Sequence, residues 1–208
     1  EQRKLKAEER STLEKLQKES EDVVDYAADM YNRYITAINT IDASARALRD
    51  KSLQNLSEDE FARGVYITAY FEAISPPKNA YLELNSTGKI QNIKSESVKK
   101  SISNYYAELE YINTQLIYFR NQYTKPVDQA GEDFFYTYDE TAPAKIKANF
   151  NFDRLCENKI FVSKHVKALR DQIAFNSSRK ELLDKAIQMC TEISKELNME
   201  CNSEKSAH

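Results

Sequence analysis

Residues 98–123 read VKKSISNYYAELEYINTQLIYFRNQY, and their apolar positions set the fold class. The spacing between these positions alternates between four and three residues: Val98, Ile102, Tyr105, Leu109, Ile112, Leu116, Phe119 and Tyr123. Such spacing places every one of them on the same face of a helix, as in a coiled-coil seam. The pattern predicts a helix that begins near Ser95, ends before Pro126 and packs lengthwise against other helices.

The N-terminal part of the chain has a similar helical period. Apolar residues step by three and four from Leu13 to Leu48, and only Ser20 is polar in the series. This predicts one amphipathic helix from the N-terminus to about residue 53, on the order of 75 Å long at ~1.5 Å per residue. Residues 1–12 include seven charged side chains, so we expect this end to project as a charged stalk.

Start and stop signals follow the first helix. Ser57 and Glu60 have the spacing of a capping box, which predicts a second helix over about 58–74. Pro76 ends it, because proline lacks a backbone N–H and disfavours helical geometry in the preceding residue. A short helical turn over 79–85 is expected next.

Residues 125–152 differ from the rest of the chain. Gly131, Pro143 and an acidic-aromatic run interrupt the helical period there. We expect a long acidic-aromatic connection with at most short helical pieces. Phe134 and Phe135 would plug the end of the bundle; alternatively the connection is a partner-docking loop, since long loops in compact domains are often functional.

The helical period returns at Asp153 and continues to Leu197. Asn176-Ser177-Ser178 compete with helical backbone hydrogen bonds, so the segment is either one long helix, bent there, or a hairpin. One helix is favoured, because tight helical hairpins usually contain stronger breakers. The sequence thus predicts an all-α protein. We expect a single domain over 1–208, an elongated bundle of about four principal helices whose long first and last helices are antiparallel.

Composition supports this class and limits the partners. Gly occurs three times and Pro four times in 208 residues, and 30% of residues are charged, which disfavours a protein built from strands and tight turns. The formal net charge of −3 predicts neither nucleic-acid binding nor a polybasic membrane patch. No apolar run approaches the roughly 20 residues that cross a bilayer.

The chain offers few groups for catalysis. Cys156, Cys190 and Cys201 lack CxxC spacing, and only His165 and His208 would add imidazole ligands, so we expect no structural zinc site. The odd cysteine count and wide spacing favour reduced or incidental thiols over a disulfide framework. There is no glycine-rich phosphate loop and no Glu-x-x-His motif. We therefore expect no enzyme, no cofactor and no metal.

Thirteen tyrosines are the one compositional excess, and several lie in the helix over 98–123. Packing in the core and at its boundary is their expected role, and an aromatic ligand patch is the alternative. The candidate residues for contact with a ligand or partner come from this helix and from the acidic-aromatic connection. They are Tyr118, Arg120, Phe134, Phe135 and Tyr136.

Three stretches carry a resemblance: EQRKLKAEE at 1–9, NAYLELNSTGKIQNI at 79–93 and ISNYYAEL at 102–109. They resemble an uncharacterised family of short, single-pass bacterial membrane proteins, over much of residues 1–125. The resemblance implies a membrane helix directly upstream of Glu1, and a basic segment before that helix would place the present domain outside the inner membrane. The uncapped, charged start of the chain agrees with a missing upstream segment.

These features lead to a functional hypothesis. We expect a non-enzymatic, extracytoplasmic (periplasmic) module of a membrane-anchored protein, which acts in sensing or in interaction with a protein partner or small ligand. One alternative is a cytoplasmic, coiled-coil-like structural or scaffold protein that pairs as a homodimer. Another is an enzyme with a site between helices built from Tyr, Glu and Arg.

Overall fold

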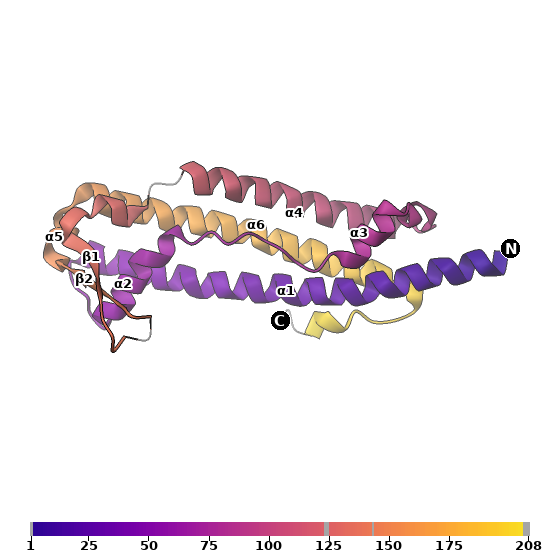
Figure 1. Cartoon of the computed structure of the whole chain (residues 1–208), viewed down its shortest axis with the longest axis horizontal. Helices are drawn as coiled ribbons and strands as arrows, with labels where there is room; N and C mark the ends of the chain where they lie inside the picture. The colour runs from indigo at the N-terminus through magenta and orange to yellow at the C-terminus, as the bar shows by residue number, and fades with distance from the viewer. Residues whose placement is uncertain (1, 123–124, 143, 206–208) are drawn as a thin grey trace. The chain divides into compact units, whose positions relative to one another are not determined.

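The computed structural model describes residues 2–122, 125–142 and 144–205, without the side chains of residues 2–6, 121, 122, 204 and 205. Tyr123, Pro143 and His208 lie outside these residues. The described α-helices are α1 (Gln2–Asp50), α2 (Glu58–Tyr66), α3 (Asn79–Ser86), α4 (Glu96–Gln122), α5 (Phe152–Glu157) and α6 (Lys159–Leu197) (Figure 1). Strands β1 (Phe134–Tyr138) and β2 (Ile146–Phe150) are antiparallel. Single 3-10 turns are η1 (Ile67–Ala69), η2 (Lys89–Asn92), η3 (Pro126–Gln129), η4 (Gly131–Asp133) and η5 (Asn202–Lys205).

The mostly helical class is confirmed, and so are the long helices. α1 ends three residues before the expected boundary, and α4 matches the predicted seam, of which Val98 to Leu116 are buried. The capping box of Ser57 and Glu60 is present at the start of α2. α6 passes through Asn176 without interruption, so the single helix is confirmed over the hairpin. It is separated from α5 only at Asn158, whose side-chain oxygen caps the new helix.

The contacts divide the chain into two compact units. Unit 1 comprises Glu1–Asn32, Ala73–Ile117 and Ser177–His208, and unit 2 comprises Arg33–Glu72 and Tyr118–Asn176. Helices α1, α4 and α6 each contribute to both units. The single domain over 1–208 and the bundle of about four principal helices stay predictions.

Helices α1 and α6 pack together in unit 1 and run antiparallel there. The amide nitrogen of Gln17 lies 3.7 Å from the Cys190 sulfur, and the Lys180 ammonium lies 5.9 Å from the centre of the Tyr31 ring. Positions later in α1 therefore meet positions earlier in α6. None of the described helices is long and apolar enough to cross a membrane.

Cys190 and Cys201 form a disulfide in unit 1, so the prediction of reduced or incidental thiols is wrong for this pair. The two residues are eleven apart, yet their Cα atoms lie 5.7 Å apart. The reason is the chain reversal after α6, where Asn198 adopts a left-handed conformation with φ 57°. The returning segment is held to α1 by the Ser203 hydroxyl, which donates to the Glu21 carbonyl at 3.1 Å.

Unit 2 has an aromatic core. The Phe61 side chain is fully buried, and its ring centre lies 5.0 Å from that of Phe150 and 5.2 Å from that of Phe152. Phe134 and Phe161 belong to the same cluster. This packing explains why the region folds around aromatic residues from three separate segments.

The hairpin corrects the prediction for residues 125–152, which expected at most short helical pieces. β1 and β2 pair in register from Phe134 opposite Phe150 to Tyr138 opposite Ile146. Aromatic residues fit a pleated sheet well, and two of them anchor the open end of the hairpin in the core. The protein is therefore mostly helical with a small sheet, rather than all-α.

The second helix is shorter than the predicted 58–74. After η1 the chain has no regular secondary structure until α3 (Figure 1). Side chains of the long helices bind its backbone groups: in unit 2 the Gln172 amide donates to the carbonyl of Tyr70 at 3.1 Å. In unit 1 the Asn113 amide both accepts from the N–H of Ile74 and donates to its carbonyl. These bonds replace the helical ones that the sequence pattern led us to expect.

Candidate functional site

One face of α1 in unit 1 lies against a segment that we call the arm, residues 79–94, which contains α3 and η2. Both Ser11 and Thr12 lie three or four residues from Glu8 and from Lys15, and Glu19 lies four residues after Lys15, so these residues share one side of the helix. Glu9 binds the backbone N–H of Lys94 in the arm, and Glu8, Ser11 and Thr12 line a cavity beside the arm. The stalk over residues 1–12 stays a prediction. The side chains of residues 2–6 are outside the described part.

Glu19 fixes the beginning of the arm. Its carboxylate accepts hydrogen bonds from the backbone N–H groups of Ala80 at 2.5 Å and Tyr81 at 2.9 Å. These are two of the otherwise unpaired donors of the first turn of α3, and Lys78 at the cap position makes no side-chain cap. A residue of α1 thus supplies the cap that the local sequence lacks.

The same carboxylate also meets α4. The Tyr106 hydroxyl donates to it at 3.4 Å, and the Tyr106 ring stacks on the Tyr81 ring at 3.5 Å between centres. Burial, followed by the nearby Glu19 charge, raises the pKa of Tyr106. Glu19 therefore joins α1, α3 and α4 at one point.

Two ion pairs hold the arm further along. Lys15 Nζ lies 3.0 Å from the carboxylate of Glu83, and this contact lowers the pKa of Glu83. The Glu9 carboxylate accepts from the backbone N–H of Lys94 at 2.8 Å and lies 3.8 Å from its ammonium group. Glu9, Lys15 and Glu19 thus attach the arm to α1 at successive levels of the helix.

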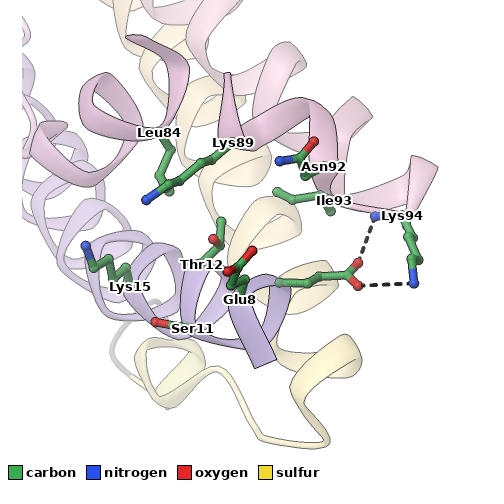
Figure 2. Close-up of a pocket in the computed structure, with 10 residues that line it drawn as sticks. Glu8, Ser11, Thr12, Lys15, Leu84, Lys89, Asn92, Ile93 and Lys94 are labelled. Atoms are coloured by element: carbon green, nitrogen blue, oxygen red, sulfur yellow. Dashed lines mark hydrogen bonds and ion pairs between the residues drawn. The ribbon is translucent and has the colours of Figure 1, made fainter. Parts of the chain in front are cut away.

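A cavity of 460 Å³ lies between α1 and the arm (Figure 2). It is lined by Glu8, Glu9, Ser11, Thr12, Lys15, Leu84, Lys89, Asn92, Ile93 and Lys94. Leu84 and Ile93 are almost completely buried and give it an apolar part. Charged groups, hydroxyls and an amide make up the rest, a mixture typical of sites for small polar ligands.

The charges of the cavity are not all neutralised by each other. Lys15 and Lys94 have carboxylate partners, as described above. Among the described side chains, Lys89 and Glu8 form no ion pair. Lys89 acts on the Glu83 carboxylate only at longer range. One cation of the arm and one anion of α1, neither in an ion pair with a described side chain, therefore line the same space.

The residues predicted for ligand or partner contact all lie in unit 2. The Tyr118 side chain is exposed and its ring packs edge-on against Phe119. Arg120 donates to the backbone carbonyl of Phe71 at 2.7 Å, so its guanidinium group supports the chain after η1.

The other three predicted residues follow one another on β1. Phe134 is buried in the unit 2 core, whereas the side chain of Phe135 is 50% exposed, so the expected plug is formed by only one of the two. Tyr136 packs edge-on against Tyr66 and Phe134. In the described part of the chain, the contacts of Tyr118 and Arg120 share no residue with those of β1. The five residues stay predictions as contact residues, and they do not form one site.

Sequence reasoning missed the cavity. A signal was present in α1, where polar residues from Glu8 to Glu19 recur at helical spacing, although only residues 1–12 were interpreted as a stalk. A polar stripe with this spacing usually marks a solvated face, and nothing local identifies the arm as its partner.

Unit 2 contains a buried Ser–His pair, with Ser44 Oγ 2.9 Å from His165 Nε2. Both residues are completely buried, and burial lowers the pKa of His165 to about 4. The pair has no access for a substrate, so we assign it a structural role.

In the described residues, no group of three or more His, Cys, Asp or Glu side chains is placed to hold a metal ion. The chain was also compared with known proteins. No family model, no curated protein and no solved structure matches it.

Proposed function

We propose that this chain is a non-enzymatic, extracytoplasmic sensing module that binds a small ligand in the cavity between α1 and the arm. The observation that carries the proposal is the cavity itself. Its volume of 460 Å³ falls within the ~300–1,000 Å³ of small-molecule sites. Its lining combines an apolar part with unneutralised charges.

The disulfide supports the extracytoplasmic part of the proposal. Disulfides persist in oxidising compartments and are rare where thiols are kept reduced. Cys190 and Cys201 are both buried, so this bond stabilises unit 1 rather than presenting a reactive site. Anchoring by a membrane segment upstream of Glu1 belongs to the proposal as well, and it rests on the family resemblance alone.

The geometry also suggests how binding would be transmitted. The arm can be close to α1 or detached from it. A ligand that contacts both stabilises the close state, by an amount set by the difference between its affinities for the close and the detached states. Of the existing links, Lys15–Glu83 is exposed and therefore weak, and in Glu9–Lys94 the ammonium group lies 3.8 Å from a partly buried carboxylate. A bound ligand would thus shift the position of the arm on α1.

The test uses the purified chain and pools of small metabolites in a thermal-shift assay, followed by isothermal titration of any stabilising compound. Ser11→Trp fills the cavity from an exposed position, and Lys18→Trp is the matched control on an exposed part of α1 that does not line it. We expect a stabilising compound for the unmodified chain and for Lys18→Trp, but not for Ser11→Trp. Equal binding by Ser11→Trp, or no stabilising pool, contradicts the proposal.

Protein interaction is the second candidate, favoured by one observation in unit 2. Partners in the hairpin register share a face, and Tyr136, Tyr138 and Ile146 on one face are all exposed, as is neighbouring Tyr66. Exposed apolar patches often mark interaction sites. Sedimentation equilibrium tests for a homodimer. The unmodified chain should dimerise, and Tyr138→Ser should dimerise more weakly.

The coiled-coil scaffold remains the alternative to both. Its seam would be formed by α4, whose residues from Val98 to Leu116 on the seam are buried within unit 1. Pairing through this seam would require unit 1 to open. The enzyme with a site between helices built from Tyr, Glu and Arg also remains an alternative.

A further inference from the structure

We infer that the cavity binds a small zwitterion of the α-amino acid class with an apolar side chain, its carboxylate on Lys89 and its ammonium group on Glu8. This inference rests on the proposed function, because it names the ligand class of that cavity. It is carried by the pattern of paired and unpaired charges, by the hydroxyl groups beside them and by the apolar part of the lining.

The charged residues that line the cavity differ in whether they have an ion-pair partner. Five charged residues line the cavity, namely Glu8, Glu9, Lys15, Lys89 and Lys94. Ion pairs within unit 1 occupy Glu9, Lys15 and Lys94. Among the described side chains, one carboxylate and one ammonium group of the lining have no ion pair, and they belong to opposite walls: Glu8 to α1, and Lys89 to η2 of the arm (Figure 2).

The sign of these charges decides between ligand classes. A simple anion would be attracted by Lys89 but repelled by Glu8 and Glu9, and a simple cation would be repelled by the three lysines. A molecule with both charges satisfies Glu8 and Lys89 together and so gains from both walls. Discrimination of this kind comes from the unfavourable contacts of the wrong ligand as much as from favourable contacts of the right one.

Neutral polar groups complete the polar part. Ser11 and Thr12 bring hydroxyls from the α1 wall, and Asn92 brings an amide from the arm (Figure 2). These groups both donate and accept hydrogen bonds, so they fit the carboxylate and the ammonium group of a zwitterion. Thr12 is only 8% exposed, which places its hydroxyl at the inner part of the cavity.

The apolar part gives the side-chain preference. Leu84 and Ile93 line the cavity from the arm and are 1% and 2% exposed, so their positions are fixed by packing. An aliphatic or aromatic ligand side chain would contact the small exposed part of these two side chains and bury its own apolar surface there. A polar side chain would lose its hydration there without a partner.

The experiment compares three compounds of similar shape by isothermal titration: leucine, 3-methylbutylamine, which lacks the carboxylate, and 4-methylpentanoate, which lacks the ammonium group. Valine, isoleucine, methionine and phenylalanine are titrated in parallel to cover the side-chain class. We expect at least one of these amino acids to bind, and each analogue lacking one charge to bind about tenfold or more weakly, since hydrogen bonds to charged groups are the stronger ones.

Two variants assign the charges. Glu8→Gln should weaken amino-acid binding without weakening the binding of 4-methylpentanoate, from which it removes a repulsion. Lys89→Met should likewise weaken amino-acid binding without weakening the binding of 3-methylbutylamine. Lys18→Met and Glu110→Gln are the matched controls, at exposed positions outside the cavity, and should bind as the unmodified chain does. Each variant and the analogue that lacks the matching charge form a cycle like a double-mutant cycle, with the ligand as the second partner. A general loss of stability would weaken the binding of all compounds and would not produce this pattern.

The outcomes separate the two proposals. If 4-methylpentanoate or 3-methylbutylamine binds as tightly as leucine, the zwitterion inference is overturned while a cavity ligand remains. The same holds if no apolar amino acid binds but another compound stabilises the chain in a manner that Ser11→Trp abolishes. If no compound binds in a Ser11→Trp-sensitive manner, the proposed function fails together with the inference.

Discussion

Units 1 and 2 contain different parts of the same three long helices, α1, α4 and α6. Different interactions stabilise each unit. Unit 1 has a mainly aliphatic core, to which the buried seam of α4 belongs. A disulfide and polar links add to it, among them the Glu19 cap of α3 and the ion pair of Lys185 on α6 with Glu108 on α4. Unit 2 is held by rings that pack around Phe61. The same long helices therefore contribute to one unit with an aliphatic core, a disulfide and polar links, and to another with an aromatic core.

This difference has consequences for dynamics. Burial of large rings is insensitive to salt, whereas exposed ion pairs are weak and screened. The arm of unit 1 buries Leu84, Ile90 and Ile93, but its polar contacts with α1 are such pairs and one cap. Elements that respond to ligands are drawn from parts of low local stability, and this agrees with a cavity under the arm.

The largest effect is expected from Phe61→Ala in unit 2. Removing a fully buried ring from the aromatic core should lower the free energy of unfolding by about 3 to 5 kcal/mol. Urea unfolding measures the loss, and hydrogen exchange locates it. The loss of exchange protection should be located in unit 2, around residue 61. A greater loss at the amides of the unit 1 arm would contradict the role of the aromatic core in stabilising unit 2. Tyr138→Ala, at an exposed position of the hairpin, is the control.

His165 should make stability depend on pH through unit 2. Burial lowers its pKa from 6.5 to about 4, so the unfolded chain takes up a proton below about pH 6.5 that the folded chain does not bind until about pH 4. The associated stability is present above pH 6.5 and is lost as the pH falls, by about 3 kcal/mol in total at ~1.36 kcal/mol per unit.

The measurement is urea unfolding at pH 7 and at pH 4.5 for the unmodified chain and for His165→Gln, which retains a donor toward Ser44. The variant should lose less stability between the two pH values, because carboxylates titrate equally in both proteins. An equal loss would show that His165 does not titrate as the buried neutral group of the folded state.

Cleavage of the disulfide should affect unit 1 selectively. Cys190→Ser with Cys201→Ser removes a cross-link of eleven residues' separation, which should lower stability by about 2 to 3 kcal/mol. Cys156→Ser is the control, since Cys156 is the free cysteine of the described residues. Mass spectrometry after thiol alkylation checks the pairing. Labelling of all three cysteines without reductant would disprove the bond.

The smallest effect is expected at the arm. Glu19→Ala removes the tertiary cap of α3 and should cost about 1 kcal/mol, with loss of exchange protection at the amides of Ala80 and Tyr81. Glu19→Gln keeps an acceptor oxygen and should retain part of the protection. Loss of protection around Phe61 in either variant would mean that the two units are not held independently.

The sequence was most informative where contacts are local. Helical periodicity located α1, α4 and α6, and a three-residue spacing located the capping box of Ser57. It failed after Tyr66, because the helix ends there although the pattern continues to residue 74. Side chains distant in sequence, such as Asn113, satisfy the backbone of that segment, and no local pattern reports such partners.

By itself, then, the sequence determined which faces of the long helices are apolar, because that property depends only on the helical period. Only the tertiary structure decided the disulfide, since Cys201 reaches Cys190 through a chain reversal at Asn198. It also decided the candidate site. The walls of the cavity come from segments about as far apart as Lys15 and Glu83, which are separated by 68 residues. Which charges neutralise each other, and which remain free for a ligand, depends on that folding together.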